Sequence, residues 1–156
     1  MIKIKSQIGN LLHVKSGHIV HGCNAQGVMG SGVALAVKRK FPAAYEDYAR
    51  IYRDHGLLLG VAYPLAASPN LVIWNAITQD GFGSPTRNTS YDAIQTCFEQ
   101  INETLSQAKS SHCELHIPKI GAARGGGNWE IIREIIEQTM DYPVTLWLPD
   151  DTVDTK

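Results

Sequence analysis

Two glycine-rich segments of this chain have the residue types and spacing of phosphate-binding loops. The glycines concerned are Gly27, Gly30 and Gly32 in the first segment and Gly121, Gly125, Gly126 and Gly127 in the second. Glycine allows positive φ angles and a close approach of the backbone to a ligand, and backbone amides at a helix N-terminus favour an anion. We therefore expect both segments to bind phosphate, although the first could also be no more than a tight turn between a strand and a helix.

The spacing of the first three glycines excludes two common nucleotide-binding motifs. It matches neither G-x-G-x-x-G, which is typical of dinucleotide sites in Rossmann folds, nor G-x-x-x-x-G-K-[ST], the P-loop. The polar residues Asn24 and Gln26, which directly precede these glycines, favour a ligand over a plain turn.

Three polar residues beside the glycines are the candidates for catalysis. Asn24 has an amide that can both donate to and accept from a ribose hydroxyl, and Arg124 can make a charge-assisted contact to phosphate. His21 is the candidate proton-transfer group. The alternatives are an Asx-turn for Asn24, a solvent-exposed loop position for Arg124, and a hydrogen-bonded core position for His21.

Composition limits the function classes. With a formal net charge of -1, the chain has no general attraction to the phosphates of a long nucleic acid, so we expect no such partner. The basic run Lys38, Arg39 and Lys40 is interpreted as a solvated helix end.

Cysteine usage and hydropathy indicate the compartment. The cysteines, Cys23, Cys97 and Cys113, are odd in number and form no C-x-x-C pair, which argues against disulfides and against structural zinc. No apolar stretch is long enough to be a signal core or a membrane span. We expect a cytoplasmic protein with no metal, no cofactor and no membrane contact.

Hydrophobic periodicity predicts alternating strands and helices. Strands are expected at residues 2–5, 18–23, 60–66, 70–78, 113–117 and 144–148. Helices are expected at residues 33–40, from 42 until Gly56, from a cap at Thr89 or Ser90 through Leu105, and at 129–140, the last with Ile131, Ile132, Ile135 and Ile136 facing inward. The apolar strand at 70–78 should be central.

This alternation predicts an α/β fold, a three-layer α/β/α sandwich with a mixed, largely parallel central sheet. We expect one domain at residues 1–150 and a C-terminal tail at 151–156. Ligands of such sheets sit outside the carboxyl ends of the strands, and both glycine-rich segments directly follow a strand. The two segments should therefore share one cleft.

Together these segments resemble the macro domain, an ADP-ribose-binding family. The resemblance extends over most of the chain: Gly9-Asn10-Leu11, residues 21–42, residues 75–79, Ser90-Tyr91-Asp92-Ala93 and residues 117–129. Within the family, the sequence is similar to the branch of ADP-ribose 1″-phosphate phosphatases and their deacylase and toxin-antagonist relatives.

The resemblance implies that the two loops enclose the diphosphate and the distal ribose of ADP-ribose. Many members have an aspartate where this chain has Asn10, and its carboxylate accepts from the adenine amino group, as an asparagine carbonyl also could. The implied substrate-binding residues are Gly9, Asn10, Leu11, Asn24, Gly27, Met29, Gly30, Ser31, Gly32, Val33, Ile120, Gly121, Ala122, Ala123, Arg124, Gly125, Gly126 and Gly127.

The sequence departs from part of the family at two positions. Members that remove ADP-ribose from carboxylates or DNA have a lysine and an aspartate where this chain has Gln79 and Gly125. The resemblance therefore implies a phosphoric monoester hydrolase that converts ADP-ribose 1″-phosphate to ADP-ribose and phosphate, with His21, Asn24 and Arg124 as the catalytic set. The alternatives are a non-catalytic ADP-ribose-binding module and a hydrolase that removes ADP-ribose from a macromolecule.

Overall fold

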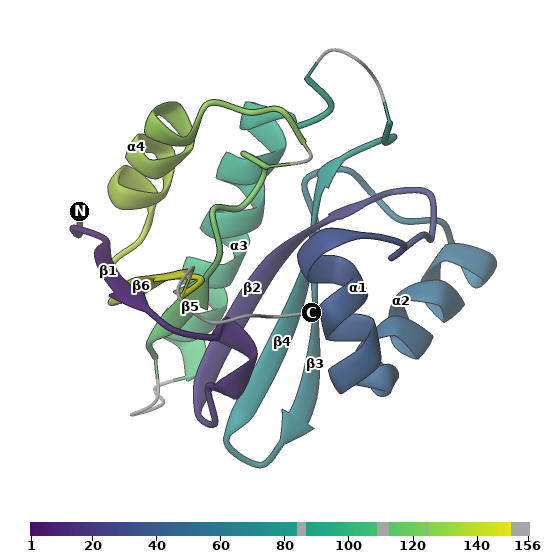
Figure 1. Ribbon diagram of the computed structural model, residues 1–156, viewed down its shortest axis with the longest axis horizontal. Helices are drawn as coiled ribbons and strands as arrows, with labels where there is room; N and C mark the ends of the chain where they lie inside the picture. The colour runs from purple at the N-terminus through teal and green to yellow at the C-terminus, as the bar shows by residue number, and fades with distance from the viewer. Residues whose placement is uncertain (84–86, 109–112, 124, 151–156) are drawn as a thin grey trace.

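The computed structural model describes residues 1–83, 87–108, 113–123 and 125–150 (Figure 1). Within these residues, six strands are interspersed with helices. The elements are β1 (Lys5–Ile8), the short 3-10 helix η1 (Leu11–His13), β2 (Gly17–Asn24), α1 (Gly32–Lys40), α2 (Pro42–Asp54), β3 (Ala62–Ser68), β4 (Leu71–Gln79), α3 (Tyr91–Ala108), β5 (Leu115–Ile117), α4 (Trp129–Thr139) and β6 (Val144–Leu148).

The strands form one sheet in the order β1-β6-β5-β2-β4-β3. Every neighbouring pair is parallel except β3 and β4, which are antiparallel. The predicted mixed, largely parallel sheet is therefore confirmed. β4 is paired on both sides, by β2 and by β3, which agrees with its almost continuously buried sequence.

Helices cover both faces of the sheet, so the predicted three-layer sandwich is also confirmed. Figure 1 shows α3 and α4 on one side and α1 and α2 on the other. Under α3 and α4 lies a core that includes Trp74, Phe98 and Ile132. On the other face, Ile19 and Ile73 of the sheet pack with residues of η1, α1 and α2.

Local signals explain where most helices begin and end. Pro42 occupies the first turn of α2, and Gly56, with a φ of 77°, follows its C-cap. The Ser90 hydroxyl accepts from the Ala93 amide at the start of α3, and the Asn128 side chain accepts from the Glu130 amide at the start of α4.

The structure corrects two sequence predictions. Residues 2–4 are not in a strand, because the Ile2 and Ile4 amides bond to the backbone and the side chain of Glu137, and β1 begins at Lys5. In α4, Ile132 and Ile136 are buried as expected, but Ile131 is 43% exposed because its position turns away from the sheet. Neither correction alters the edge of the sheet at which the glycine-rich segments lie.

The parallel arrangement places the carboxyl ends of β2, β4 and β5 at one edge. Asn24 and Gln79 are register partners where β2 and β4 end, and β5 ends nearby at Ile117. The connections that follow these strands contain the two glycine-rich segments, here called loop 1 (residues 25–31) and loop 2 (residues 118–128). The predicted tail, residues 151–156, lies outside the described residues, so the domain boundary at 150 stays a prediction.

Candidate functional site

Loop 1 is folded by the side chain of Asn24. Its Oδ1 atom accepts from the Gln26 amide at 2.9 Å and from the Val28 amide at 3.4 Å, and its Nδ2 atom donates to the Val28 carbonyl at 2.8 Å. This is the Asx-turn that the sequence left open as an alternative. Asn24 therefore shapes the loop, and any contact it makes to a ribose comes in addition to that task.

A buried tyrosine attaches loop 1 to α2. The Tyr48 hydroxyl lies 2.6 Å from the Asn24 carbonyl oxygen and 3.0 Å from Asn24 Oδ1. Burial raises the pKa of Tyr48, which keeps the phenol protonated and able to donate. Met29 is 1% exposed and packs in the same core with Ala25, so it anchors loop 1 from inside the protein.

The remainder of loop 1 is exposed and nearly free of large side chains. Gly30, Ser31 and Gly32 are all open to solvent, and Gly32 starts α1 with a φ of 60°. Gly27 has a φ of 77°, and a Cβ atom there would lie 2.7 Å from the Tyr52 ring. Only glycine fits at Gly27, because both its backbone conformation and its contact with Tyr52 exclude a side chain.

Loop 2 also has glycines in the left-handed region, Gly121 at a φ of 75° and Gly126 at 74°. Ile120 before them is buried in the core under α3 and α4, so its side chain anchors the loop. Ala122 and Ala123 follow, with little bulk over the backbone. Arg124 lies outside the described residues, so its predicted phosphate contact stays a prediction.

The His21 side chain is not exposed beside the two loops. Its side chain is 0% exposed, and its Nε2 atom lies 2.6 Å from Asn75 Oδ1. Burial lowers the pKa of His21 to about 4, against the opposing effect of the Asn75 hydrogen bond. A neutral imidazole that is enclosed in the core beside Asn75 cannot exchange a proton with a bound ligand. The proton-transfer role expected for His21 is therefore corrected to the alternative, a hydrogen-bonded core position.

Gln79 and Gly125, the two positions at which the sequence differs from some members of the family it resembles, lie side by side. A Cβ atom on Gly125 would be 3.0 Å from Gln79 Oε1 and 2.7 Å from the Gly121 carbonyl oxygen, and it would collide with Thr89 Oγ1. The side-chain Nε2 atom of Gln79 donates to the Gly81 carbonyl at 2.7 Å. Loop 2 therefore has a neutral amide beside Gly125 and no room for a carboxylate side chain at that position.

Asn10 is engaged within its own segment. Its Oδ1 atom caps η1 by accepting from the Leu12 amide at 2.9 Å, and its Nδ2 atom lies 3.3 Å from His13 Nε2. Adenine recognition by Asn10 would therefore require its side-chain oxygen to accept a second hydrogen bond. The Gly9 backbone next to it packs against the Trp147 ring, with no space for a Cβ atom.

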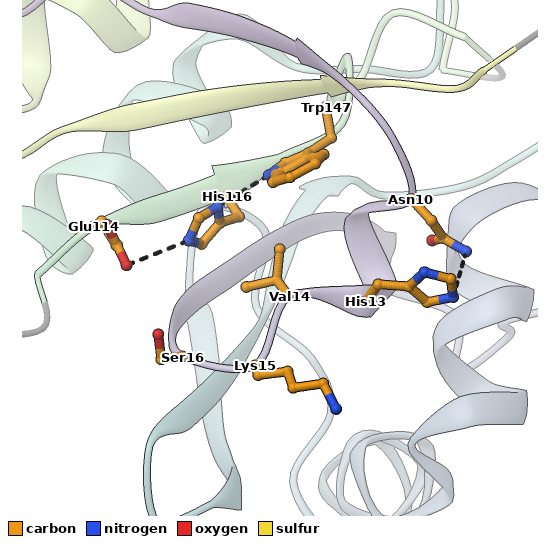
Figure 2. Close-up of a pocket in the computed structure, with 8 residues that line it drawn as sticks. All are labelled: Asn10, His13, Val14, Lys15, Ser16, Glu114, His116 and Trp147. Carbon is orange, nitrogen blue, oxygen red and sulfur yellow. Dashed lines mark hydrogen bonds and ion pairs between the residues drawn. The ribbon is translucent and has the colours of Figure 1, made fainter.

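Asn10 also lines a cavity of about 380 Å³ that does not lie between the two loops (Figure 2). Figure 2 shows it between the segment that precedes β2 and the strands β5 and β6. The Trp147 indole donates to His116 Nδ1 at 3.0 Å, and His116 Nε2 is 3.9 Å from a Glu114 oxygen, too far for a hydrogen bond. Burial is the main reason that the pKa of His116 is lowered.

Sequence reasoning missed two side chains that build the site. Tyr45, Tyr48 and Tyr52 recur at helical spacing in the sequence, but this spacing does not show that the Tyr48 hydroxyl reaches Asn24. The sequence indicates Thr89 only as a candidate helix cap, whereas its hydroxyl donates to the Gly121 carbonyl, 32 positions along the chain, at 2.8 Å. Contacts over such a separation leave no local signal in a sequence.

The part of the chain that the structure describes contains neither a candidate metal site nor a candidate membrane-spanning helix. Within those residues, no three His, Cys, Asp or Glu side chains are placed to hold a metal ion. No helix in the same ranges has the length and the apolar character needed to cross a membrane.

Comparison with protein families gives one match that extends over most of the sheet. The model of the Macro domain family matches residues 20–136. This range contains both loops, Gln79 and Thr89, and it starts within β2 and ends within α4.

Three curated relatives have similar sequences. An uncharacterized 17.5 kDa protein of Enterobacteria phage T4 is 29% identical, with 88% of this chain and 91% of the relative covered. A DNA ADP-ribosyl glycohydrolase of Thermus aquaticus is 28% identical over 85% of this chain, which spans only 36% of that protein. An ADP-ribose 1″-phosphate phosphatase of Candida albicans is 23% identical, with 77% of this chain and 80% of the relative covered.

Solved structures have the same fold. A protein of unknown function from Bacteroides thetaiotaomicron superposes with a TM-score of 0.85 at 26% identity, covering 94% of this chain and 98% of that one. The macrodomain of Thermus aquaticus DarG superposes with a TM-score of 0.79 at 23% identity, covering 94% of this chain and 98% of that one.

Proposed function

This chain belongs to the macro domain family, and we propose that the cleft between loop 1 and loop 2 binds the diphosphate of ADP-ribose or of an ADP-ribose derivative. The observation that carries this proposal is the placement of two glycine-rich loops directly after β2 and β5, which are adjacent parallel strands. Each loop contains glycine in the left-handed region and leads into the N-terminus of a helix, where backbone amides favour an anion.

The reaction we propose for the cleft is hydrolysis of ADP-ribose 1″-phosphate. Water attacks the phosphorus, the bond from phosphorus to the ribose oxygen breaks, and that oxygen takes up a proton, which gives ADP-ribose and phosphate. The closeness of the neutral Gln79 side chain to Gly125 supports this reaction over removal of ADP-ribose from a macromolecule. One of the relatives carries the name of this phosphatase.

The residues proposed for this reaction differ from the set expected from the sequence. Asn24 would present loop 1 to the distal ribose, and Arg124 would neutralise phosphate charge as the transition state forms. His21 has no part in the proposed reaction, because its imidazole is enclosed in the core.

A second candidate function is binding without turnover. Residues 24–33 and 120–128 contain one ionisable side chain, that of Arg124. Loops without a general acid or base of their own suit a module that holds ADP-ribose and releases it unchanged.

Removal of ADP-ribose from a macromolecule is the third outcome to test. The Thermus aquaticus relative is named for such an activity on DNA, but this chain spans about a third of that protein. In addition, the space beside Gln79 excludes a side chain at position 125.

Calorimetry with ADP-ribose and phosphate release from ADP-ribose 1″-phosphate, run on the same preparation, distinguish these functions. Binding together with phosphate release supports the phosphatase, and binding without release supports the module. Release of ADP-ribose from an ADP-ribosylated oligonucleotide would support the third reading.

Matched variants place the measured binding in the cleft. Gly126→Ala puts a side chain at a φ of 74° in loop 2, whereas Gly81→Ala puts one into open space outside both loops. We expect Gly126→Ala to weaken ADP-ribose binding by at least tenfold and Gly81→Ala to leave it unchanged. Equal effects from the two variants, or no binding by the folded wild-type protein, would disprove the proposal.

A further inference from the structure

Residues 88–91, the segment at the start of α3, form hydrogen bonds with the backbone of loop 2. The Asn88 and Thr89 amides both donate to the Gly125 carbonyl, at 2.8 and 3.1 Å. At the far end of the loop, the Asn128 amide donates to the Tyr91 hydroxyl at 3.0 Å. The conformation of loop 2 is therefore set largely by a segment more than thirty residues earlier in the chain.

Thr89 makes the central contacts of this arrangement. Its hydroxyl donates to the Gly121 carbonyl, which also accepts from the Gly127 amide at 2.9 Å. Thr89 is 2% exposed, and Cβ atoms built on Gly121 and Gly125 would both run into its side chain. Glycine at positions 121 and 125 therefore allows the close contact of loop 2 with the Thr89 side chain.

These hydrogen bonds determine which backbone groups loop 2 can present to a ligand. Both lone-pair regions of the Gly121 and Gly125 carbonyl oxygens are occupied from within the protein. In a trans peptide the N–H points opposite to the preceding C=O, so the Gly126 N–H is directed away from residues 88–89. A carbonyl oxygen facing a phosphate would repel it, whereas an amide N–H attracts it.

We propose that Thr89 is a positioning residue for phosphate binding: its hydroxyl fixes the Gly121 carbonyl, and its backbone amide, together with that of Asn88, fixes the Gly125 carbonyl, so that the Gly126 amide is aimed at the diphosphate. The inference rests on the proposed function. Thr89 itself touches no ligand, because its hydroxyl is buried behind the loop.

Three variants test this role. Thr89→Val keeps the shape of the side chain and removes the hydroxyl, and Thr89→Ser keeps the hydroxyl. Thr104→Val is the matched control, because the Thr104 hydroxyl also donates to a backbone carbonyl, at 2.9 Å, but within α3 and near the end of that helix opposite to Thr89.

We expect calorimetry to show an ADP-ribose affinity about tenfold lower for Thr89→Val, which corresponds to the loss of one hydrogen bond at full effect. Thr89→Ser and Thr104→Val should bind within about threefold of the wild type. Wild-type affinity in folded Thr89→Val, or an equal loss in Thr89→Ser, would overturn the proposal. If Thr89→Val does not fold, Thr89→Ala, which removes the same hydroxyl and adds no atoms, should still weaken binding relative to Thr104→Val, and no weakening would overturn the proposal.

A second readout separates this inference from the proposed function. In protein labelled with ¹⁵N-glycine, pyrophosphate should shift the Gly126 amide resonance of the wild type and not that of Thr89→Val. If the wild type binds pyrophosphate in this way but not ADP-ribose, the proposed function fails and the role of Thr89 stands. If the Gly126 resonance responds equally in both proteins, the role of Thr89 is wrong.

Discussion

His21 and Asn75 face each other across β2 and β4, with His21 Nε2 2.6 Å from Asn75 Oδ1. The Asn75 amide nitrogen donates to the Ala44 carbonyl of α2 at 3.1 Å, so Asn75 Oδ1 is the acceptor and His21 Nε2 carries the proton. The pair connects the centre of the sheet to the helix that anchors loop 1. Its histidine therefore contributes to stability, and this contribution depends on pH.

The first prediction concerns acid sensitivity. The folded-state pKa of His21 is lowered to about 4, so between pH 6.5 and pH 4 the unfolded chain binds a proton that the folded chain does not. The free energy of unfolding should therefore fall with decreasing pH in this window, by about 1.4 kcal/mol per pH unit for one proton. Burial of His116 acts in the same direction. Urea denaturation at pH 7, 6 and 5 measures the slope.

His21→Gln provides the comparison, because it removes the titrating group and keeps a polar side chain. The pH dependence of its free energy of unfolding should be weaker than that of the wild type by about one bound proton. The same His21→Gln protein, at a pH where it is folded, should release phosphate from ADP-ribose 1″-phosphate as the wild type does. Complete loss of that activity in the folded variant would show that His21 takes part in the reaction.

The second prediction concerns Tyr48 and loop 1. Tyr48→Phe removes the hydroxyl that bonds to Asn24 and leaves the aromatic packing intact. We expect a loss of about 1 kcal/mol in stability and a several-fold lower ADP-ribose affinity, because loop 1 is no longer attached to α2. Tyr63→Phe is the control, since the Tyr63 hydroxyl accepts from the Leu58 amide away from the loop. Equal affinities for Tyr48→Phe and the control would show that loop 1 does not depend on this hydroxyl.

The third prediction concerns the space at Gly125. A methyl group there would meet Thr89 Oγ1 and the Gly121 carbonyl oxygen, both of which belong to a bonded framework that cannot move freely. Gly125→Ala should therefore destabilise the protein by about 1–3 kcal/mol and weaken ADP-ribose binding. Gly81→Ala, in open space, should change neither quantity. An unaltered melting temperature for Gly125→Ala would mean that loop 2 has room for a side chain.

Much of the fold could be predicted because its signals are local. The apolar runs of β2 and β4 and the 3.6-residue pattern of α3 need only neighbouring residues to be interpreted, and they agree with the structure. The start of β1 could not be predicted, because the bonds from Ile2 and Ile4 to Glu137 depend on where α4 packs.

The positions of the two loops at one edge of the sheet followed from the order of strands and helices, but the roles of single side chains did not. Strand alternation shows that His21 and Gly22 point to opposite faces, yet it does not show which face α2 covers. Likewise, the glycines of loop 2 indicated a close approach of the backbone, while its partner there, Thr89, became visible only in three dimensions.

The last prediction uses the cysteines to measure how firmly loop 1 is held. Cys23 and Cys97 are buried, and burial raises the pKa of both thiols, that of Cys97 to about 12. Because only the thiolate reacts, a disulfide reagent at pH 8 should modify the half-buried Cys113 quickly and the other two only when the protein opens.

The Cys113→Ser variant should therefore lose the fast phase of the reaction, and a fast phase that persists would contradict the buried positions of Cys23 and Cys97. Cys23 shares its core cluster with Ala25 and Met29 of loop 1 and with Tyr48, so opening of the loop should be what exposes it. ADP-ribose at one hundred times its dissociation constant should then slow modification of Cys23 by up to about a hundredfold, since binding opposes opening in proportion to occupancy. Cys97 lies on the other face of the sheet, on the buried side of α3, and its modification reports global opening instead. Slowing confined to Cys97 would show that the ligand does not bind at loop 1.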